Sequence, residues 1–221
     1  MSTRLLQQFR ETVGSEHVVV EPQGIASYAI DWTGRFRGIP RAVIRPGDGA
    51  EIAAVAALCK EADVALVPQG GNTGYVGGRV PLAGEVVLSL RRLAGVTDVD
   101  TLGGQLSAGA GTTVSDVQAA AADAGWAYGV DLGSRDSATI GRTVAPNAAG
   151  LQGAPPLHHE GAARGLRSCA RDERHCFAHW RTHKGQHGVR PRRVALRQRR
   201  NARSGDRRMI APSAAEPGAV L

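Results

Sequence analysis

One continuous stretch, residues 41–74, constrains the fold of this 221-residue chain more than any other part. It has the sequence RAVIRPGDGAEIAAVAALCKEADVALVPQGGNTG. A short apolar strand ends at Pro46 and Gly47, and an alanine-rich helix follows over residues 50–61. Residues 64–67 form a second apolar strand, and a glycine-rich loop comes directly after it. This order predicts a βαβ unit, in which the strands run parallel.

The flanking segments add further helices and strands. Leu5, Leu6, Phe9 and Val13 recur at helical spacing, which predicts a short amphipathic helix at the N-terminus. The segments EVVLSLRRL and QLSAGAG are typical of strands, and TTVSDVQAAAADAG is typical of a helix with a threonine or serine cap. The pattern up to residue 150 is α+β or α/β, without an internal repeat, and we assign α+β.

The composition changes abruptly near residue 150. Residues 1–150 hold 12 Lys+Arg and 15 Asp+Glu, a net charge of −3, whereas residues 151–221 hold 15 and 5, a net charge of +10. Six of the seven histidines also lie after residue 150. We therefore expect an N-terminal helix and lead-in over residues 1–24, a folded domain over 25–150, and a basic, disordered tail over 151–221.

The cysteines and the N-terminal sequence indicate a compartment. Three cysteines at irregular spacing do not form a disulfide framework, and the start MSTRLLQQFRETVG lacks an apolar run of signal-peptide length. We expect a cytoplasmic protein without a membrane span.

The first candidate site is VPQGGNTGYVGG, residues 67–78, where five glycines follow an apolar strand. Backbone without Cβ atoms can approach a ligand closely and present successive N–H groups to phosphate oxygens. No Gly-Lys-Ser/Thr follows, so this is not a Walker loop, and no helix follows, so it is not a Rossmann turn. A wide structural turn is the alternative, but Asn72 and Thr73 between the glycines favour anion binding.

The second candidate is GVDLGSRDSATIGRTVAPNAAG, residues 129–150, a run of small residues with hydroxyls at Ser134, Ser137 and Thr139. A third glycine-containing segment, GAGTTVSDV at Gly109, lacks the remaining features of a dinucleotide-binding turn. We interpret it as an ordinary strand-to-helix turn.

Taken together, VPQGGNTGYVGG, DLGSRDSATIG and NAAG resemble the FAD-binding domain of flavin-linked oxidases of the vanillyl-alcohol-oxidase (VAO) or PCMH type. Within that group the chain is similar in particular to the D-2-hydroxyacid dehydrogenases for D-2-hydroxyglutarate, D-lactate and glycolate. The segments DWTGRFRG, RPGDGAEIAAV and LSLRRLAGVTDVD carry the same resemblance, which covers roughly residues 25–150. It implies an incomplete VAO/PCMH-type FAD-binding domain with a βαβ N-terminal subdomain and a mixed-sheet second subdomain.

The resemblance also implies a cofactor site for FAD, without a Rossmann fold or a covalent flavin bond. The first loop would wrap the FAD diphosphate, its last two glycines would lie near the flavin, and the second loop would line the opposite wall. The positions assigned to FAD are Pro68, Gln69, Gly70, Gly71, Asn72, Thr73, Gly74, Gly77, Gly78, Leu132, Gly133, Ser134, Ser137, Ile140, Gly141, Ala145 and Asn147.

The chain departs from the family pattern at three positions. Arg142 and Ala149 stand where the family has glycine, and Pro146 stands where it has threonine. An arginine beside the cofactor would either block FAD or pair with a phosphate.

By the same resemblance, the family takes a hydride from the α-carbon of a D-2-hydroxyacid onto FAD. Its catalytic residues come largely from a later domain, so we assign no catalytic residue and no metal ligand here. The implied partners are FAD and, in an intact relative only, a small 2-hydroxyacid.

Two signatures that the family carries, similar to KDNTGYDL and GSEGTLG, are absent. With plausible codons, a one-base shift converts KGQHGVRP (residues 184–191) into KDNTGYD, and the same shift converts RQRRNAR (residues 197–203) into GSEGTLG. We infer that the reading frame slips near residues 148–155, which leaves a truncated flavoenzyme without activity of its own. A shifted GC-rich frame also explains the many arginines.

Three other interpretations of the tail stay open. Its cations could bind nucleic acid or another polyanion non-specifically, or the whole chain could be a non-functional remnant. Zinc binding is disfavoured because the Cys-x6-Cys spacing is not that of a zinc finger. The residues concerned are Cys169, Cys176, His179, His183 and His187.

Overall fold

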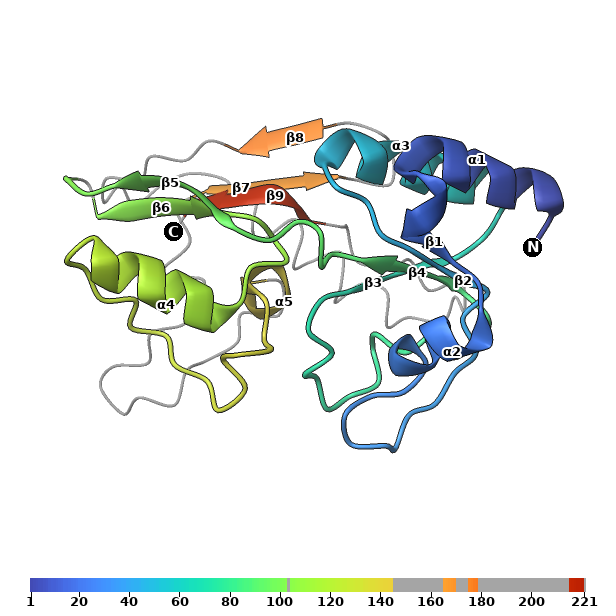
Figure 1. Ribbon diagram of the computed structural model, residues 1–221, viewed down its shortest axis with the longest axis horizontal. Coiled ribbons are helices and arrows are strands. Elements are labelled where there is room, and N and C mark those ends of the chain that lie inside the picture. Colours follow the sequence, from blue (N-terminus) through green and yellow to red (C-terminus); the bar gives the residue numbers. More distant parts are fainter. Residues whose placement is uncertain (103, 145–164, 170–174, 179–214, 221) are drawn as a thin grey trace, which may run out of the picture.

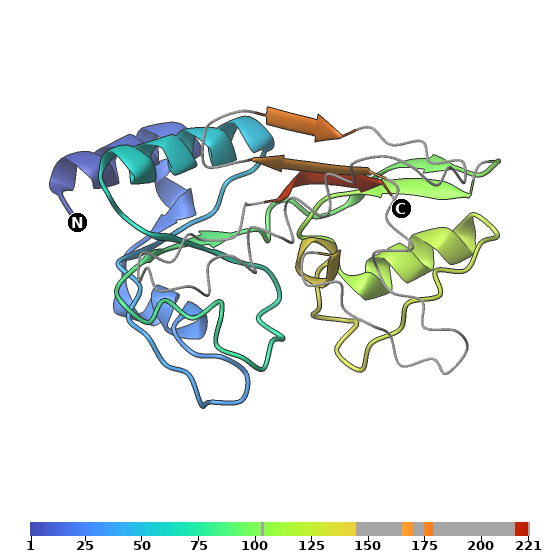
Figure 2. The ribbon, with the colours of Figure 1, turned by 180° about the vertical axis from the view of Figure 1, so that it is seen from behind.

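The computed structural model describes residues 1–102, 104–144, 165–169, 175–178 and 215–220, the last three segments by their backbone alone. Figure 1 shows two β-sheets side by side along the long axis, each with its own helices. Seen from behind in Figure 2, the N-terminal helices and the later part of the chain lie at opposite ends. The α+β fold class is therefore confirmed for this part of the chain.

The first sheet has the strand order β1-β2-β4-β3. β1 (Val18–Val19) is antiparallel to β2 (Ala42–Ile44), whereas β2 and β3 (Leu66–Gln69) both run parallel to β4 (Val86–Ser89). α3 (Gly49–Glu61) connects β2 with β3. The predicted βαβ unit is present with parallel strands, and β4 lies between its two strands.

Alternating side chains of the first sheet supply two apolar layers. α1 (Thr3–Val13) and α3 cover one face, and Tyr28 with the helix α2 (Pro22–Ile25) covers the other. Val43 and Val87 belong to the α2 side. The larger layer contains Leu5, Phe9, Val13, Val18, Ala42, Ile44, Ile52, Val55, Cys59, Val86 and Leu88. The helical spacing of Leu5, Phe9 and Val13 thus buries one face of α1, as predicted.

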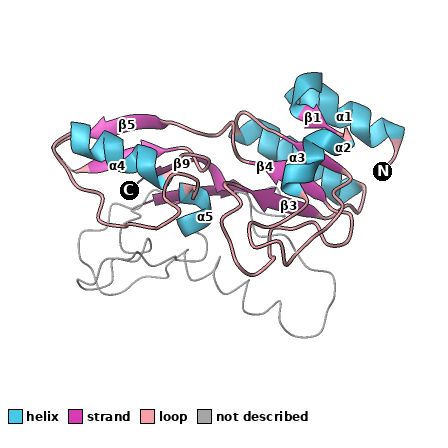
Figure 3. Ribbon diagram, turned by 60° about the horizontal axis from the view of Figure 1, so that its bottom comes forward, coloured by secondary structure: helices cyan, strands magenta, loops and turns pink. Residues whose placement is uncertain are grey.

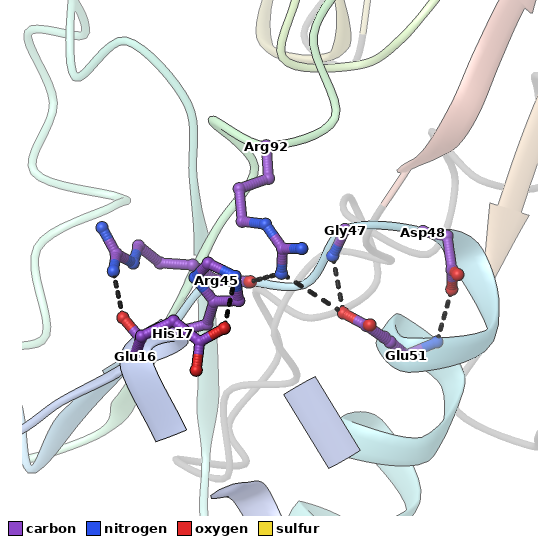
Figure 4. Close-up of polar contacts among 7 residues, drawn as sticks. All are labelled: Glu16, His17, Arg45, Gly47, Asp48, Glu51 and Arg92. Atoms are coloured by element: carbon purple, nitrogen blue, oxygen red, sulfur yellow. Dashed lines mark hydrogen bonds and ion pairs between the residues drawn. The ribbon is translucent and has the colours of Figure 1, made fainter. Parts of the chain in front are cut away.

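The turn that leads from β2 into α3 is held by a polar cluster (Figure 4). Asp48 is the N-cap, and its carboxylate accepts a hydrogen bond of 2.9 Å from the amide of Glu51. The Glu51 carboxylate in turn accepts a 2.7 Å bond from the amide of Gly47 and lies 3.6 Å from Arg92 Nη1. The first bond satisfies an amide that a helix leaves unpaired in its first turn, and the second ties the residue before the cap to the helix.

The second sheet consists of antiparallel pairs in the order β5-β6-β9-β7-β8. β5 (Val96–Asp100) and β6 (Gln105–Ala108) precede α4 (Val114–Asp123) in the chain. Leu106 and Ala108 of β6 belong to one buried cluster with residues of α4. Figure 3 shows α4 lying along this sheet and α5 near its inner end.

Three short strands lie in the range where the sequence predicts a basic, low-order tail. They are β7 (Gly165–Cys169), β8 (His175–Ala178) and β9 (Ala215–Val220). β9 pairs with β6, because an edge strand presents unpaired backbone N–H and C=O groups to any neighbouring segment. The prediction for the rest of residues 151–221 lies outside the described residues.

The two sheets meet where the chain leaves β4. A Cβ at Gly109 would lie 2.0 Å from the carbonyl oxygen of Leu93, and one at Gly111 would lie 2.0 Å from that of Leu90. These glycines therefore allow two backbone segments to touch. The GAGTTVSDV segment is a strand-to-helix turn, as the sequence analysis expected, and Thr113 caps α4.

No helix in the part of the chain that the structure describes has the length and apolar character that a membrane crossing requires. This finding concerns only those residues.

Candidate functional site

The two loops selected from the sequence are in direct contact. A Cβ built on Gly71 would lie 1.4 Å from the carbonyl oxygen of Ser137, and one built on Gly70 would lie 2.2 Å from Thr139 Oγ1. Both distances are far below any real carbon contact. Only residues without a side chain allow this approach, so the glycines of the first loop serve the packing of one loop on the other.

The first loop is fixed to its own sheet by two amide side chains. Gln69 Nε2 donates hydrogen bonds of 3.1 Å to the carbonyl oxygens of Tyr28 and Arg79, and Gln69 is 2% exposed. Asn72 Nδ2 donates a 2.7 Å hydrogen bond to the carbonyl oxygen of Ile30. Asn72 has a φ of 55°, a left-handed conformation that asparagine tolerates better than most residues. Both side chains thus hold the loop in shape.

The second loop is fixed to the start of α4 and to the turn before it. The amide of Val114 bonds to the carbonyl oxygen of Ala138 at 2.9 Å, and the amide of Ile140 bonds to that of Thr112 at 2.9 Å. Ile140 is fully buried in the cluster beneath α4. The segment before these bonds is more open, since Gly133 and Ser137 are exposed. The loop therefore has an anchored end and an accessible end.

α5 (Ile140–Val144) continues the second loop and brings a cation to the first. Together with residues of the first loop, Arg142 lines a small pocket that side chains almost completely fill. The pocket residues are Asp31, Asn72, Gly74, Val76, Gly77, Gly78, Arg79, Val80 and Arg142. Among these described residues two are arginines and one is a carboxylate, so cations are in excess.

Arg79 is the most unusual group of this pocket. It is 6% exposed, and within the described residues neither Nη1 nor Nη2 has a hydrogen-bond partner. Burial first, and then the charge of Arg142, lower the pKa of Arg79 to about 10, against an opposing effect of Asp31. The guanidinium is therefore still charged at neutral pH, in a place where a buried charge without a partner is costly.

The carboxylate of Asp31 is occupied by its own turn. It accepts hydrogen bonds of 2.5 Å from Thr33 Oγ1 and 3.1 Å from the amide of Phe36. Burial raises the pKa of Asp31, but hydrogen bonds from the Thr33 hydroxyl and from backbone amides, that of Phe36 first, lower it by more. The pKa therefore lies below its usual value, which makes this carboxylate a weak base.

The donor set suits an anion with several oxygens. Two guanidinium groups and a loop of backbone amides provide positive charge and N–H donors, as phosphate groups require. Three buried polar atoms nearby, Arg79 Nη1, Arg79 Nη2 and Thr139 Oγ1, have no hydrogen-bond partner among the described residues. The residues present therefore fit the diphosphate of a dinucleotide such as FAD. The small pocket itself encloses no room for the flavin ring.

Not every predicted site residue takes part in this arrangement. The structure brings together the loop over residues 68–74 and the segment 132–141, and it places Gly77 and Gly78 at the pocket. Ala145 and Asn147 lie outside the described residues, as do His179, His183 and His187 and the side chains of Cys169 and Cys176.

Arg79 was not selected from the sequence, although it directly follows the last two glycines of the first loop. The signal that could have found it is a lone arginine in the otherwise apolar and glycine-rich run YVGGRVPLAG. The position of Arg142 was noted only as a departure from the family pattern.

Comparisons with known proteins show the family of this chain. Residues 40–167 match the family described as FAD binding domain, which is more than half of the chain. The chain belongs to this family of FAD-binding domains, whose cofactor is FAD, as the resemblance in the sequence indicated.

Two curated relatives are D-2-hydroxyglutarate dehydrogenases. The protein from Xanthomonas citri pv. viticola is 36% identical over 152 residues, which are 69% of this chain and 32% of the relative. The "Probable D-2-hydroxyglutarate dehydrogenase, mitochondrial" of Oryza sativa subsp. indica is 32% identical over 144 residues, 65% of this chain and 26% of the relative. The chain thus spans about a quarter to a third of the length of these relatives.

Solved structures show the same fold at lower sequence identity. Alkyldihydroxyacetonephosphate synthase superposes with a TM-score of 0.80 at 15% identity, over 100% of this chain and 40% of that protein. A 4-ethylphenol oxidase from Gulosibacter chungangensis superposes with a TM-score of 0.72 at 19% identity, over 98% of this chain and 41% of the oxidase. The VAO/PCMH-type fold is therefore confirmed.

Proposed function

We propose that this chain is the FAD-binding part of an oxidoreductase that oxidises a D-2-hydroxyacid, and that it holds the FAD diphosphate between residues 68–78 and 132–147. The observation that carries the proposal is the direct packing of the two loops, with the Gly71 backbone against the carbonyl group of Ser137. Support also comes from the three glycines and two arginines that line one pocket of the first loop, namely Gly74, Gly77, Gly78, Arg79 and Arg142. FAD, when bound, supplies the hydride acceptor of such a reaction.

Retention of FAD by the chain tests this proposal. The purified full chain is mixed with excess FAD and passed through a gel-filtration column, and absorbance near the flavin maximum is followed in the protein peak. A flavin absorbance that travels with folded protein supports the proposal. Folded protein that emerges colourless would refute it.

We also propose that the chain alone does not turn over a 2-hydroxyacid. A general base must reach the proton it removes and must have a pKa near the working pH. Asp31 is the one carboxylate among the described residues that line the pocket, and its lowered pKa and its bonds to Thr33 and Phe36 make it unsuitable. Incubation of the FAD-loaded chain with D-2-hydroxyglutarate and an electron-accepting dye should therefore give no dye reduction, and a steady rate would contradict this.

The third part of the proposal concerns the coding sequence. With codons chosen to fit residues 184–191 and 197–203, a one-base shift gives KDNTGYD and GSEGTLG in one frame, and an excess of basic over acidic residues begins only after residue 150. We attribute both features to a slip of the reading frame near residues 148–155. Sequencing of the coding DNA from codon 140 to beyond codon 221 decides the matter. A neighbouring frame that stays open and encodes both signatures supports the slip, and a frame closed by stop codons refutes it.

A cytoplasmic location and binding of polyanions by residues 151–221 stay predictions. The curated relatives include proteins named as mitochondrial. The polyanion prediction falls largely on residues outside the described part of the chain.

A further inference from the structure

The linker over residues 90–95 joins the two sheets, since it leads from β4 to β5. Arg92 lies in this linker, and its side chain turns back to the first sheet (Figure 4). Arg92 Nη1 donates a hydrogen bond of 2.7 Å to the carbonyl oxygen of Arg45, directly after β2, and lies 3.6 Å from Glu51 Oε2 of α3. One guanidinium group therefore ties the linker to two elements of the first sheet.

Gly47 leaves the space that this guanidinium group fills. A Cβ at Gly47 would lie 2.7 Å from Arg92 Nη2 and 3.0 Å from Arg92 Cζ. The amide of Gly47 donates a 2.7 Å hydrogen bond to Glu51 Oε2, the same oxygen that faces Arg92. A planar guanidinium group can face a carbonyl and a carboxylate oxygen at once, because it carries several N–H donors in fixed directions. A methyl group at position 47 would displace it.

The linker also carries the second sheet. The amide of Gly111 donates a 2.8 Å hydrogen bond to the carbonyl oxygen of Leu93. The hydroxyl group of Thr112 accepts a 2.9 Å bond from the amide of Gly95 and donates a 3.0 Å bond to the carbonyl oxygen of the same residue. We call this contact between the linker and the turn over residues 109–112 the junction. It attaches the second sheet to the chain segment that Arg92 holds.

The second loop is attached to the junction in turn. The amide of Ile140 donates a 2.9 Å hydrogen bond to the carbonyl oxygen of Thr112, and the amide of Gly141 donates one of 2.9 Å to that of Ala110. A Cβ at Gly141 would lie 2.8 Å from the Cβ of Ala110, so the two segments pack closely. A continuous series of contacts therefore runs from α3 through Arg92 and the linker to the second loop. Where that loop meets the first loop depends on where the linker lies.

We propose that Arg92 is a positioning residue that keeps the junction closed and so sets the position of the second loop against the first. Without its side chain, the linker keeps the 2.9 Å bond from the amide of Leu90 to the carbonyl oxygen of Gln69, but it loses its tie to β2 and α3. The junction then opens locally more often, while each sheet keeps its own core. The effect on the junction does not need the proposed function, whereas an effect on FAD rests on it.

The test is amide hydrogen exchange of the full chain, followed by NMR at single residues, in the unchanged protein and in Arg92→Met. The amides of Gly111, Ile140 and Gly141 should exchange roughly three- to tenfold faster in the variant, as the loss of a partly exposed hydrogen bond predicts. The buried amides of α1 and α3 should exchange at the same rate in both proteins. Equal acceleration of all amides, which indicates global destabilisation, would overturn the proposal, as would no acceleration at the junction.

Two further variants test whether the guanidinium group acts where it lies. Arg91→Met is the matched control, because the guanidinium group of Arg91 lies 5.4 Å from the centroid of the Tyr28 ring, so its loss should leave the junction unchanged. Gly47→Ala displaces the guanidinium group without changing Arg92 itself, so it should accelerate the same amides, and it should add nothing to Arg92→Met. Equal effects of Arg91→Met and Arg92→Met, or additive effects of Gly47→Ala and Arg92→Met, would contradict the proposal.

Titration with FAD distinguishes this inference from the proposed function. An FAD affinity that is several-fold lower in Arg92→Met than in the unchanged chain and in Arg91→Met supports the role of the junction in placing the loops. Equal affinity in all three proteins would overturn that role and leave the proposed function intact. A folded, unchanged chain that binds no FAD would refute the proposed function, and the exchange rates at the junction would still test Arg92.

Discussion

The substitution Gly71→Ala tests the contact on which the candidate site depends. A Cβ at this position would lie 1.4 Å from the carbonyl oxygen of Ser137 and 2.6 Å from its carbon. Because carbon atoms pack at about 3.5 Å or more, the two loops would have to separate by about 2 Å. The obstacle is backbone, which cannot rotate away as a side chain could.

The cost follows from measured overpacking. Extra atoms in a well-packed interior cost about 1–3 kcal/mol and occasionally more, and a clash with backbone belongs at the upper end. For a chain of this size, about 3 kcal/mol corresponds to a fall of roughly 6–12 °C in melting temperature. The assay is thermal unfolding followed by circular dichroism, with urea unfolding as a second measure of the free energy.

Gly78→Ala is the matched control in the same loop. A Cβ at Gly78 meets nothing within 4 Å, and its φ lies outside the left-handed region. Its melting temperature should therefore stay within a degree or two of that of the unchanged chain, or rise slightly because alanine restricts the unfolded state. Equal melting temperatures for Gly71→Ala and Gly78→Ala would refute the loop contact.

The remaining predictions concern Cys59, the cap of α3 and the carboxylate of Asp31. Burial raises the pKa of the Cys59 thiol to about 12. Iodoacetamide at pH 8 should therefore label Cys59 only after unfolding, which peptide mass spectrometry measures. Equal labelling of folded and unfolded protein would contradict this. The same shift makes the stability from Cys59 complete below about pH 9 and lost as the pH rises toward 12. Asp48→Ala removes the N-cap of α3 and should lower the free energy of unfolding, measured in urea, by about 1 kcal/mol. Asp48→Asn should lower it little. Equal losses in the two variants would count against the cap. Because the pKa of Asp31 is lowered in the folded chain, its contribution to stability is present above about pH 4 and is lost as the pH falls through the pKa of the folded state. The difference in melting temperature between the unchanged chain and Asp31→Asn should therefore shrink at pH 3.

The secondary structure was predictable where the sequence carries a local signal. The spacing of Leu5, Phe9 and Val13 predicts α1, and the run from β2 to β3 predicts a parallel unit, because periodicity and turn residues act over a few positions. The strand order was not predictable in the same way. β4 enters between β2 and β3 only in the folded chain, and nothing local marks that insertion.

The site was predictable as two loops and not as a pocket. The resemblance to flavin-linked oxidases indicated that the loops around residues 70 and 137 belong together, although they are far apart in the chain. It could not show that Gly71 serves to admit the backbone of Ser137, or that Arg79 and Arg142 meet at Gly74. Contacts of this kind depend on how the two sheets join, which no spacing in the sequence records.

The most direct test of the account is a titration of the full chain with FAD, followed by flavin fluorescence, in the absence and presence of inorganic diphosphate at constant ionic strength. The account predicts saturable binding of FAD and an apparent dissociation constant that rises linearly with the concentration of diphosphate, because both ligands would occupy the proposed diphosphate site between the two loops. FAD binding that diphosphate leaves unchanged, or folded protein that does not bind FAD, would contradict it.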